Sequence, residues 1–226
     1  MLPRSGDGSS FVAPSITVGS TPTSMSTVRF TGLVALPGHL ARTTSAAALV
    51  ASIALAGCVG AGNARPAPTV GSTAPDFTVR AITREGPMPA PITLSGLRGK
   101  TVVIAFFPKA RTPGCTTQLT AYRDRYAALF HGGKNVVLLA VSTDSEGALL
   151  DWAREAGFPF ALVSDADGSL GKAYGALTPG GLKFAKRLLF VVGPDGRVAY
   201  EAKPFRQNAE EAYTELAAAI DRVAAR

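Results

Sequence analysis

The chain has 226 residues, more than the usual size of one domain, and a modest basic excess, with a formal charge of +7. Lys and Arg are interspersed with Asp and Glu without a long basic run, which argues against a nucleic-acid-binding protein. Residues 1–72 hold few charged groups among Ser, Thr, Gly, Ala and Pro, whereas charge and alternating apolar patterns fill the sequence after Pro75. We therefore predict one globular domain at residues 71–226, preceded by a segment of another kind.

That N-terminal segment contains an uncharged, alanine-rich stretch at residues 44–57, which follows Arg29 and Arg42 and ends directly before Cys58. Its length and flanks are typical of the apolar region of a signal peptide. A membrane-spanning helix needs about 20 strongly apolar residues, so this stretch is too short to span. The sequence therefore predicts a cleaved signal peptide.

The end of the stretch, Leu55-Ala56-Gly57-Cys58, resembles the lipobox of bacterial lipoproteins, in which small residues precede a cysteine that becomes lipidated. The resemblance implies a signal peptide at residues 1–57 and a lipid-anchored flexible linker at residues 58–70. Because residues 1–24 are long and polar for the start of a signal peptide, Met25 is a candidate for the true start. The alternative is a small hydrophobic cysteine in an uncleaved helix. We expect an extracytoplasmic protein, lipid-anchored to a membrane in the periplasm or at the cell surface.

Within the domain, apolar runs and helical patterns alternate along the chain. Two buried strands enclose a helix, an arrangement that predicts a βαβ unit with parallel strands. A Gly-Pro-Asp-Gly turn between two further runs predicts an antiparallel hairpin. In chain order we expect a strand at 101–107, a helix at 114–130, a strand at 136–142, a helix at 145–156, strands at 160–163, 188–192 and 197–202, and a helix at 210–223. This order fits an α/β, thioredoxin-like fold with a central mixed sheet flanked by helices.

Residues with the potential for chemistry gather where the first of these strands meets the first helix, in Phe-Pro-Lys-Ala-Arg-Thr-Pro-Gly-Cys-Thr at residues 107–116. The spacing Pro-x-x-x-Thr-x-x-Cys, formed by Pro108, Thr112 and Cys115, resembles the active-site signature of the peroxiredoxins. The surrounding residues are similar to the bacterioferritin-comigratory, or PrxQ-type, subgroup. The resemblance implies a thiol-dependent peroxidase that uses Cys115 to reduce hydrogen peroxide and organic hydroperoxides.

The residue types also make chemical sense by themselves. In the first turn of a helix, unpaired N–H groups and the positive end of the helix dipole favour a thiolate at Cys115. Thr112, one turn earlier, can offer its hydroxyl to a peroxide oxygen, and Pro108 would shield the thiolate from water. The alternatives are a buried inert cysteine and a threonine that only caps the helix.

A peroxide-attacking thiolate also needs a permanent cation, and Arg187 is our candidate. It matches the arginine that precedes a Thr-Phe-Leu-Ile strand in the family, although this chain has Leu189 in place of the threonine. The alternative is an arginine that merely flanks a strand. Arg111 is nearer to Cys115 in sequence, but we expect it on the surface, and we expect His131 to cap a helix end.

The subgroup often carries a second, resolving cysteine five positions after the first, where this chain has Thr120. If Cys58 is lipidated, Cys115 is the sole free thiol of the mature protein. We therefore expect a one-cysteine mechanism, in which an external thiol, either a thioredoxin-like protein or a small molecule, reduces the sulfenic acid. We expect a monomer or weak homodimer, and neither a metal nor an organic cofactor.

Three other functions compete with this interpretation. A thioredoxin-type disulfide carrier needs Cys-x-x-Cys, and the second position here is Gln118. A binding module on the same fold would have no reason to combine the four candidate residues. A relative of the glutathione peroxidases would have a Trp-Asn-Phe segment, whereas Trp152 stands in Asp-Trp-Ala.

Overall fold

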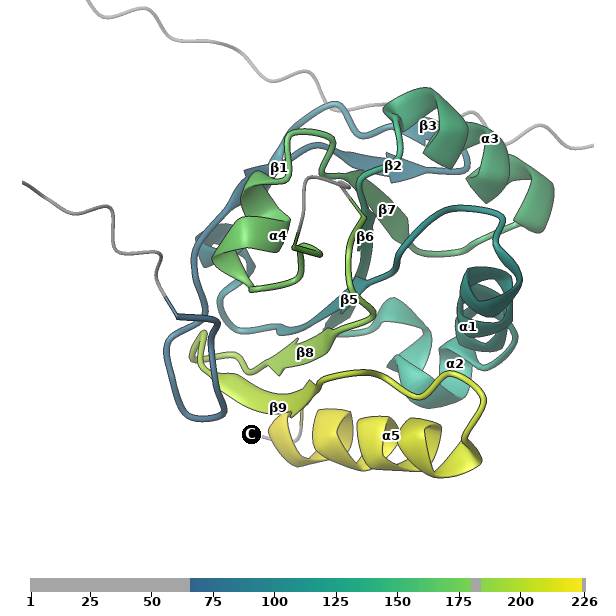
Figure 1. Ribbon diagram of the computed structural model, residues 1–226. Helices are drawn as coiled ribbons and strands as arrows, with labels where there is room; N and C mark the ends of the chain where they lie inside the picture. Colours follow the sequence, from purple (N-terminus) through teal and green to yellow (C-terminus); the bar gives the residue numbers. More distant parts are fainter. Residues whose placement is uncertain (1–65, 180–183, 225–226) are drawn as a thin grey trace, which may run out of the picture. The chain divides into compact units, whose positions relative to one another are not determined.

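The computed structural model describes residues 66–179 and 184–224, which contain a seven-stranded mixed sheet (Figure 1). Its strands lie in the order β3-β2-β7-β6-β5-β8-β9. They are β2 (Ala81–Thr83), β3 (Gly86–Pro87), β5 (Thr101–Phe106), β6 (Val136–Ser142), β7 (Ala161–Ser164), β8 (Leu189–Val192) and β9 (Val198–Ala202). A separate ladder pairs β1 (Thr78–Val79) with β4 (Ile92–Thr93).

The three central strands β5, β6 and β7 run parallel, and every other pairing in the sheet is antiparallel. The register of β5 against β6 runs from Thr101 opposite Val136 to Phe106 opposite Val141. All six residues of β5 are buried, as expected for a parallel strand covered on both faces. The predicted βαβ unit, the hairpin of β8 and β9 and the mixed α/β, thioredoxin-like sheet are therefore confirmed.

Five α-helices and two short 3-10 helices complete the described part of the chain. They are η1 (Ser95–Leu97), α1 (Pro113–Asp124), α2 (Tyr126–Leu129), η2 (His131–Gly133), α3 (Glu146–Ala156), α4 (Ser169–Ala173) and α5 (Glu210–Ala224). Successive residues of β5 point to opposite faces, so Val103 and Ala105 join one core cluster while Ile104 and Phe106 join another. The first cluster packs against α1, α2, α3 and α5, and the second against α4 and residues 74–79 (Figure 1).

The prediction of one continuous helix at 114–130 is wrong in its last part. Backbone angles of φ −107° and ψ 17° at Arg125 separate α1 from α2. In an unbroken helix, side chains eight positions apart would point about 80° away from each other. The break allows Tyr122 and Phe130 to enter the same core, where their ring centroids lie 5.3 Å apart.

The first described residues pack against the sheet. Pro68 is buried, and its carbonyl accepts a hydrogen bond of 2.9 Å from Lys203 Nζ. Gly71 N donates to the Val198 carbonyl at 2.8 Å. The folded part therefore includes chain from Pro66 onward, which the sequence had assigned to the linker at 58–70. Cys58 and the predicted signal peptide lie outside the described residues.

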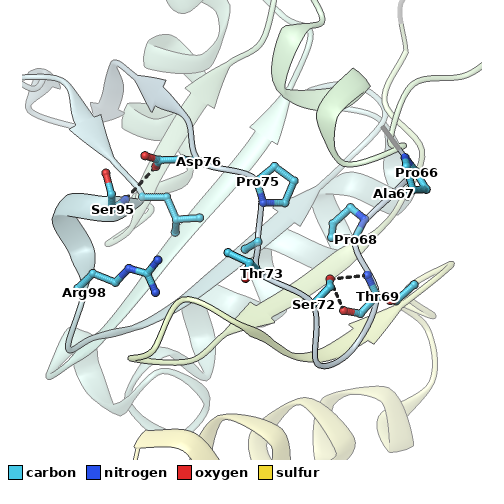
Figure 2. Close-up of a pocket in the computed structure, with 12 residues that line it drawn as sticks. Pro66, Ala67, Pro68, Thr69, Ser72, Thr73, Pro75, Asp76, Ser95 and Arg98 are labelled. Carbon is cyan, nitrogen blue, oxygen red and sulfur yellow. Dashed lines mark hydrogen bonds between the residues drawn. The ribbon is translucent and has the colours of Figure 1, made fainter. Parts of the chain in front are cut away.

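Residues 66–75 also form one wall of a cavity of about 550 Å³ (Figure 2). The opposite wall comes from η1 and its flanks, where Asp76 Oδ1 accepts a hydrogen bond of 2.9 Å from Ser95 N. Hydrogen bonds from Ser95, followed by one from Phe77, lower the pKa of the Asp76 carboxyl. None of the four candidate catalytic residues lines this cavity.

Candidate active site

Cys115 lies in the first turn of α1, where the helix starts immediately after β5 and a short loop. The helix begins at Pro113, a residue suited to a first position because it has no N–H group to leave unpaired. Thr112 precedes it in an extended conformation, with φ −74° and ψ 150°. The side chain of Cys115 is 0% exposed and belongs to the core cluster beneath α1. The sulfur therefore lies at the positive end of the helix dipole, away from bulk water.

Arg187 reaches this sulfur from the segment that leads into β8. Its Nη2 atom lies 3.4 Å from Cys115 Sγ, within the hydrogen-bonding range for sulfur. None of the ion pairs formed among the described residues includes Arg187. Its guanidinium charge is therefore free to stabilise a negative sulfur.

Gln118 holds the guanidinium from the other side, a role that no sequence motif indicates. Arg187 Nη1 donates to Gln118 Oε1, and Gln118 Nε2 donates to the Tyr122 hydroxyl at 2.9 Å. Because arginine only donates, the amide oxygen must face Arg187 and the amide nitrogen must face Tyr122. Gln118 is 0% exposed, and burial raises the pKa of Tyr122, which therefore stays neutral.

Thr112 occupies the cap position of α1, but its side chain makes no capping hydrogen bond. Its Oγ1 donates instead to the Lys109 carbonyl at 2.9 Å. A hydroxyl has one proton and two lone pairs, so Thr112 is left with lone pairs for another partner. Pro108 lies two positions beyond β5 and is half-buried. The structure thus places Pro108 and Thr112 in the loop that leads to Cys115, and brings Arg187 to the sulfur from a distant segment.

The two residues that the sequence placed outside the site lie outside it. Arg111 pairs with Glu155 on α3 at 2.8 Å and donates to the Ala148 carbonyl at 3.2 Å. His131 Nε2 lies 2.8 Å from Asp221 Oδ1 on α5, so its side chain joins two segments and does not cap a helix as expected.

A second feature that the sequence did not reveal is the loop between β9 and α5. Together with Arg187, residues 204–209 of this loop line a cavity of about 380 Å³. A Cβ atom added at Gly114 would lie 3.1 Å from Gln207 Nε2 and 3.2 Å from Arg187 Nη2. Gly114 therefore permits a close approach of both side chains to the helix start.

Other kinds of site are not supported by the described residues. No group of three or more His, Cys, Asp or Glu side chains within them is arranged to hold a metal ion. No helix in the same part of the chain is both long and apolar enough to cross a membrane. Thr120, at the expected position of a resolving cysteine, is half-buried on α1, and Cys115 is a free thiol.

Comparison with known proteins gives one consistent result. The AhpC/TSA family matches residues 70–201. A Coxiella burnetii protein named peroxiredoxin bcp is 39% identical over 108 residues, which cover 48% of this chain and 67% of that protein. Chloroplastic peroxiredoxin Q of Sedum lineare is 39% identical over 107 residues, which cover 47% of this chain and 54% of that protein.

Comparison with solved structures also finds peroxiredoxins. Peroxidoxin BcpB from Mycobacterium tuberculosis superposes with a TM-score of 0.59 at 28% identity, covering 69% of this chain and 98% of that one. The bacterioferritin comigratory protein of Xanthomonas campestris superposes with a TM-score of 0.56 at 26% identity, covering 65% of this chain and 92% of that one. Fold and site together define a thiol-dependent peroxidase of the peroxiredoxin class. The chain belongs to the AhpC/TSA family, and the two sequence relatives named above are peroxiredoxins of the Bcp and PrxQ type.

Proposed function

We propose that the chain reduces hydrogen peroxide and organic hydroperoxides at Cys115 by a one-cysteine mechanism, with an external thiol as reductant. The observation that carries the proposal is the 3.4 Å contact between Arg187 Nη2 and Cys115 Sγ. A cation that pairs with no carboxylate of residues 66–179 or 184–224, placed beside a sulfur in the first turn of a helix, favours the thiolate that attacks peroxides.

In the first step, the Cys115 thiolate attacks the nearer oxygen of the peroxide, and the O–O bond breaks. The hydroxyl group stays on sulfur as a sulfenic acid, while the other oxygen leaves as hydroxide or alkoxide and takes a proton from the solvent. Arg187 acts here because negative charge spreads from the sulfur to the leaving oxygen. The buried Tyr122 and Gln118 keep the guanidinium in place during this transfer.

Reduction of the sulfenic acid then requires thiols from outside the chain. One thiol condenses with Cys115 to give a mixed disulfide and water, and a second thiol releases Cys115 and leaves as a disulfide. Two observations support the external reductant. Thr120 occupies the position of the usual partner cysteine, and Cys115 is the free cysteine of the described residues.

The test is stopped-flow measurement of peroxide consumption by the domain at 66–226, with thioredoxin-like proteins and small thiols as donors. We expect turnover by the wild type and none above about a thousandth of that rate by Cys115→Ser, which preserves volume but forms no thiolate. An active Cys115→Ser variant would refute the proposed role of Cys115. A folded but inactive wild type would favour the alternative, a thioredoxin-like binding module.

We also propose that Cys58 anchors the domain by a lipid to a membrane, facing away from the cytoplasm. The lipobox-like Leu55-Ala56-Gly57-Cys58 after an apolar stretch supports this proposal. The test is expression of the full chain with a labelled fatty acid, comparing wild type with Cys58→Ser. We expect the label in the membrane fraction for the wild type and its loss in the variant. Equal recovery of both proteins from the cytosol would contradict the anchor.

A further inference from the structure

The loop between β5 and α1 has an unusual backbone conformation. Arg111 adopts a φ of 62°, in the left-handed region that a non-glycine residue occupies only when its surroundings hold it there. This residue lies directly before Thr112. The loop that carries Thr112 to the sulfur is therefore held in a conformation that its own sequence does not favour.

Asp144, which follows β6, is one of the groups that hold this loop. Its side chain is only 10% exposed, and its Oδ2 accepts a hydrogen bond of 2.8 Å from Ala110 N. The same oxygen accepts a 3.0 Å bond from Ser142 Oγ, and Oδ1 lies 3.6 Å from Lys109 Nζ. On the other side of the loop, Arg111 is bound to α3 as described above.

The contact of Asp144 reaches Thr112 through a single peptide group. The N–H of Ala110 and the carbonyl of Lys109 belong to the same planar unit, so neither can turn without the other. Asp144 accepts from the N–H of this unit, while Thr112 Oγ1 donates to its carbonyl at 2.9 Å. The position of Asp144 therefore determines the place of the carbonyl to which the Thr112 hydroxyl donates its hydrogen bond. It also determines which way the lone pairs of that hydroxyl point.

We propose that Asp144 is a positioning residue for the peroxide step, acting through the Lys109–Ala110 peptide on Thr112. With its proton committed to the Lys109 carbonyl, Thr112 can accept a hydrogen bond from the O–H of the incoming peroxide. Asp144 thereby contributes to orienting the peroxide but not to forming the thiolate, which depends on Arg187 and the helix start. The inference rests on the proposed peroxidase function and adds to it a residue outside the signature.

The experiment compares Asp144→Ala, Asp144→Asn and a control, Asp124→Ala, which removes an exposed carboxylate from the far end of α1. Two rates are measured for each: peroxide reduction, and alkylation of Cys115 by iodoacetamide, which needs the thiolate but no oriented peroxide. For Asp144→Ala we expect the peroxide rate to fall about tenfold or more while alkylation changes less than about twofold. Asn retains an acceptor for Ala110 N, so Asp144→Asn should keep most of the activity, as should Asp124→Ala.

A double-mutant cycle with Thr112→Val tests the route through Thr112. If Asp144 acts through that hydroxyl, the double variant should be no slower with peroxide than Thr112→Val alone. Fully additive losses would overturn the inference, as would equal losses in the peroxide and alkylation rates or no loss in either. An Asp144→Asn variant as slow as Asp144→Ala would also overturn it. If the wild type consumes no peroxide, the proposed function itself is refuted. If the wild type is active and Asp144→Ala is equally active, only the role of Asp144 is refuted.

Discussion

Arg187 Nη2 lies 3.4 Å from Cys115 Sγ, although the two residues are 72 positions apart in the sequence. The contact is possible because β8 pairs with β5, the strand that leads to the cysteine, and so brings its own leading segment to the start of α1. The Arg187 carbonyl also accepts a 2.9 Å hydrogen bond from Phe205 N, which ties this segment to the loop before α5. The cation is thus held by the sheet and by a neighbouring loop.

Replacing Arg187 should slow the peroxide step. Arg187→Ala removes a charge-assisted contact worth about 1.5 to 3 kcal/mol, which corresponds to about a tenfold to hundredfold lower peroxide rate constant. Arg187→Lys keeps the charge but loses the fork that contacts Cys115 and Gln118 together, so an intermediate rate is expected. Stopped-flow kinetics of the two variants check this order. An unchanged rate for Arg187→Ala would assign the catalytic cation to another residue.

Gln118 supplies a neutral partner to that cation, and its replacement by an acid should change the charge balance at the sulfur. In Gln118→Glu the new carboxylate would pair with Arg187, so less positive charge would stabilise the thiolate. We expect iodoacetamide to alkylate Cys115 severalfold more slowly than in wild type at the same pH, because alkylation needs the thiolate. Gln118→Leu, which leaves Arg187 and Tyr122 without their buried partner, should instead lower the free energy of unfolding by about 1 to 3 kcal/mol. An unchanged alkylation rate in Gln118→Glu would show that Arg187 is not a main source of thiolate stabilisation.

The regular elements were largely predictable from sequence because their signals are local. The buried apolar runs of β5 and β6 have no helical period, and α3 begins at a Ser145 cap and ends at Gly157. By contrast, the sequence does not predict α4. This helix has only five residues, and the N–H groups of its first turn donate to Asp165, which precedes it. Such a helix depends on contacts that a periodicity analysis does not detect.

The residues of the candidate site likewise differ in whether a local sequence pattern indicates them. Cys115 and Thr112 form a recognisable motif because the loop and the first helical turn are contiguous in sequence. In the sequence, Gln118 stands out only because it breaks a Cys-x-x-Cys pattern, and nothing there indicates that it contacts Arg187. Gln207 reaches the helix start from the loop before α5, and its type carries no signal at that distance. Side chains brought together by the sheet are therefore the part that required the structure.

The oxidised protein should carry no intramolecular disulfide. With Thr120 in place of a resolving cysteine, treatment of the reduced chain with one equivalent of peroxide should add one oxygen to Cys115. Addition of a small thiol should convert this product to a mixed disulfide. Mass spectrometry of intact protein and of peptides checks both products. A disulfide between Cys58 and Cys115 in the full chain would contradict the one-cysteine mechanism and the lipid anchor together.

Gly114 should be needed for full activity because a side chain at this position would crowd those of Gln207 and Arg187. In Gly114→Ala the new methyl group would lie 3.1 Å from Gln207 Nε2 and 3.2 Å from Arg187 Nη2, which is closer than ordinary contacts. Since Arg187 must then move from its place beside Cys115, we expect the peroxide rate constant to fall severalfold, whereas the thermal stability should change little.

The matched control for this prediction is Gly147→Ala on α3, because beyond its own helical turn a Cβ atom at Gly147 would meet nothing of the described residues within 4 Å. That variant should have wild-type activity and, as alanine favours helix, a free energy of unfolding higher by about 0.5 to 1 kcal/mol. Adding Gln207→Ala to Gly114→Ala should restore part of the lost rate. Removing the glutamine side chain leaves room for the methyl group, so Arg187 can stay closer to its place beside Cys115. If Gly114→Ala is as active as wild type, the guanidinium can shift without consequence, and its observed position beside Cys115 would not be required for the reaction.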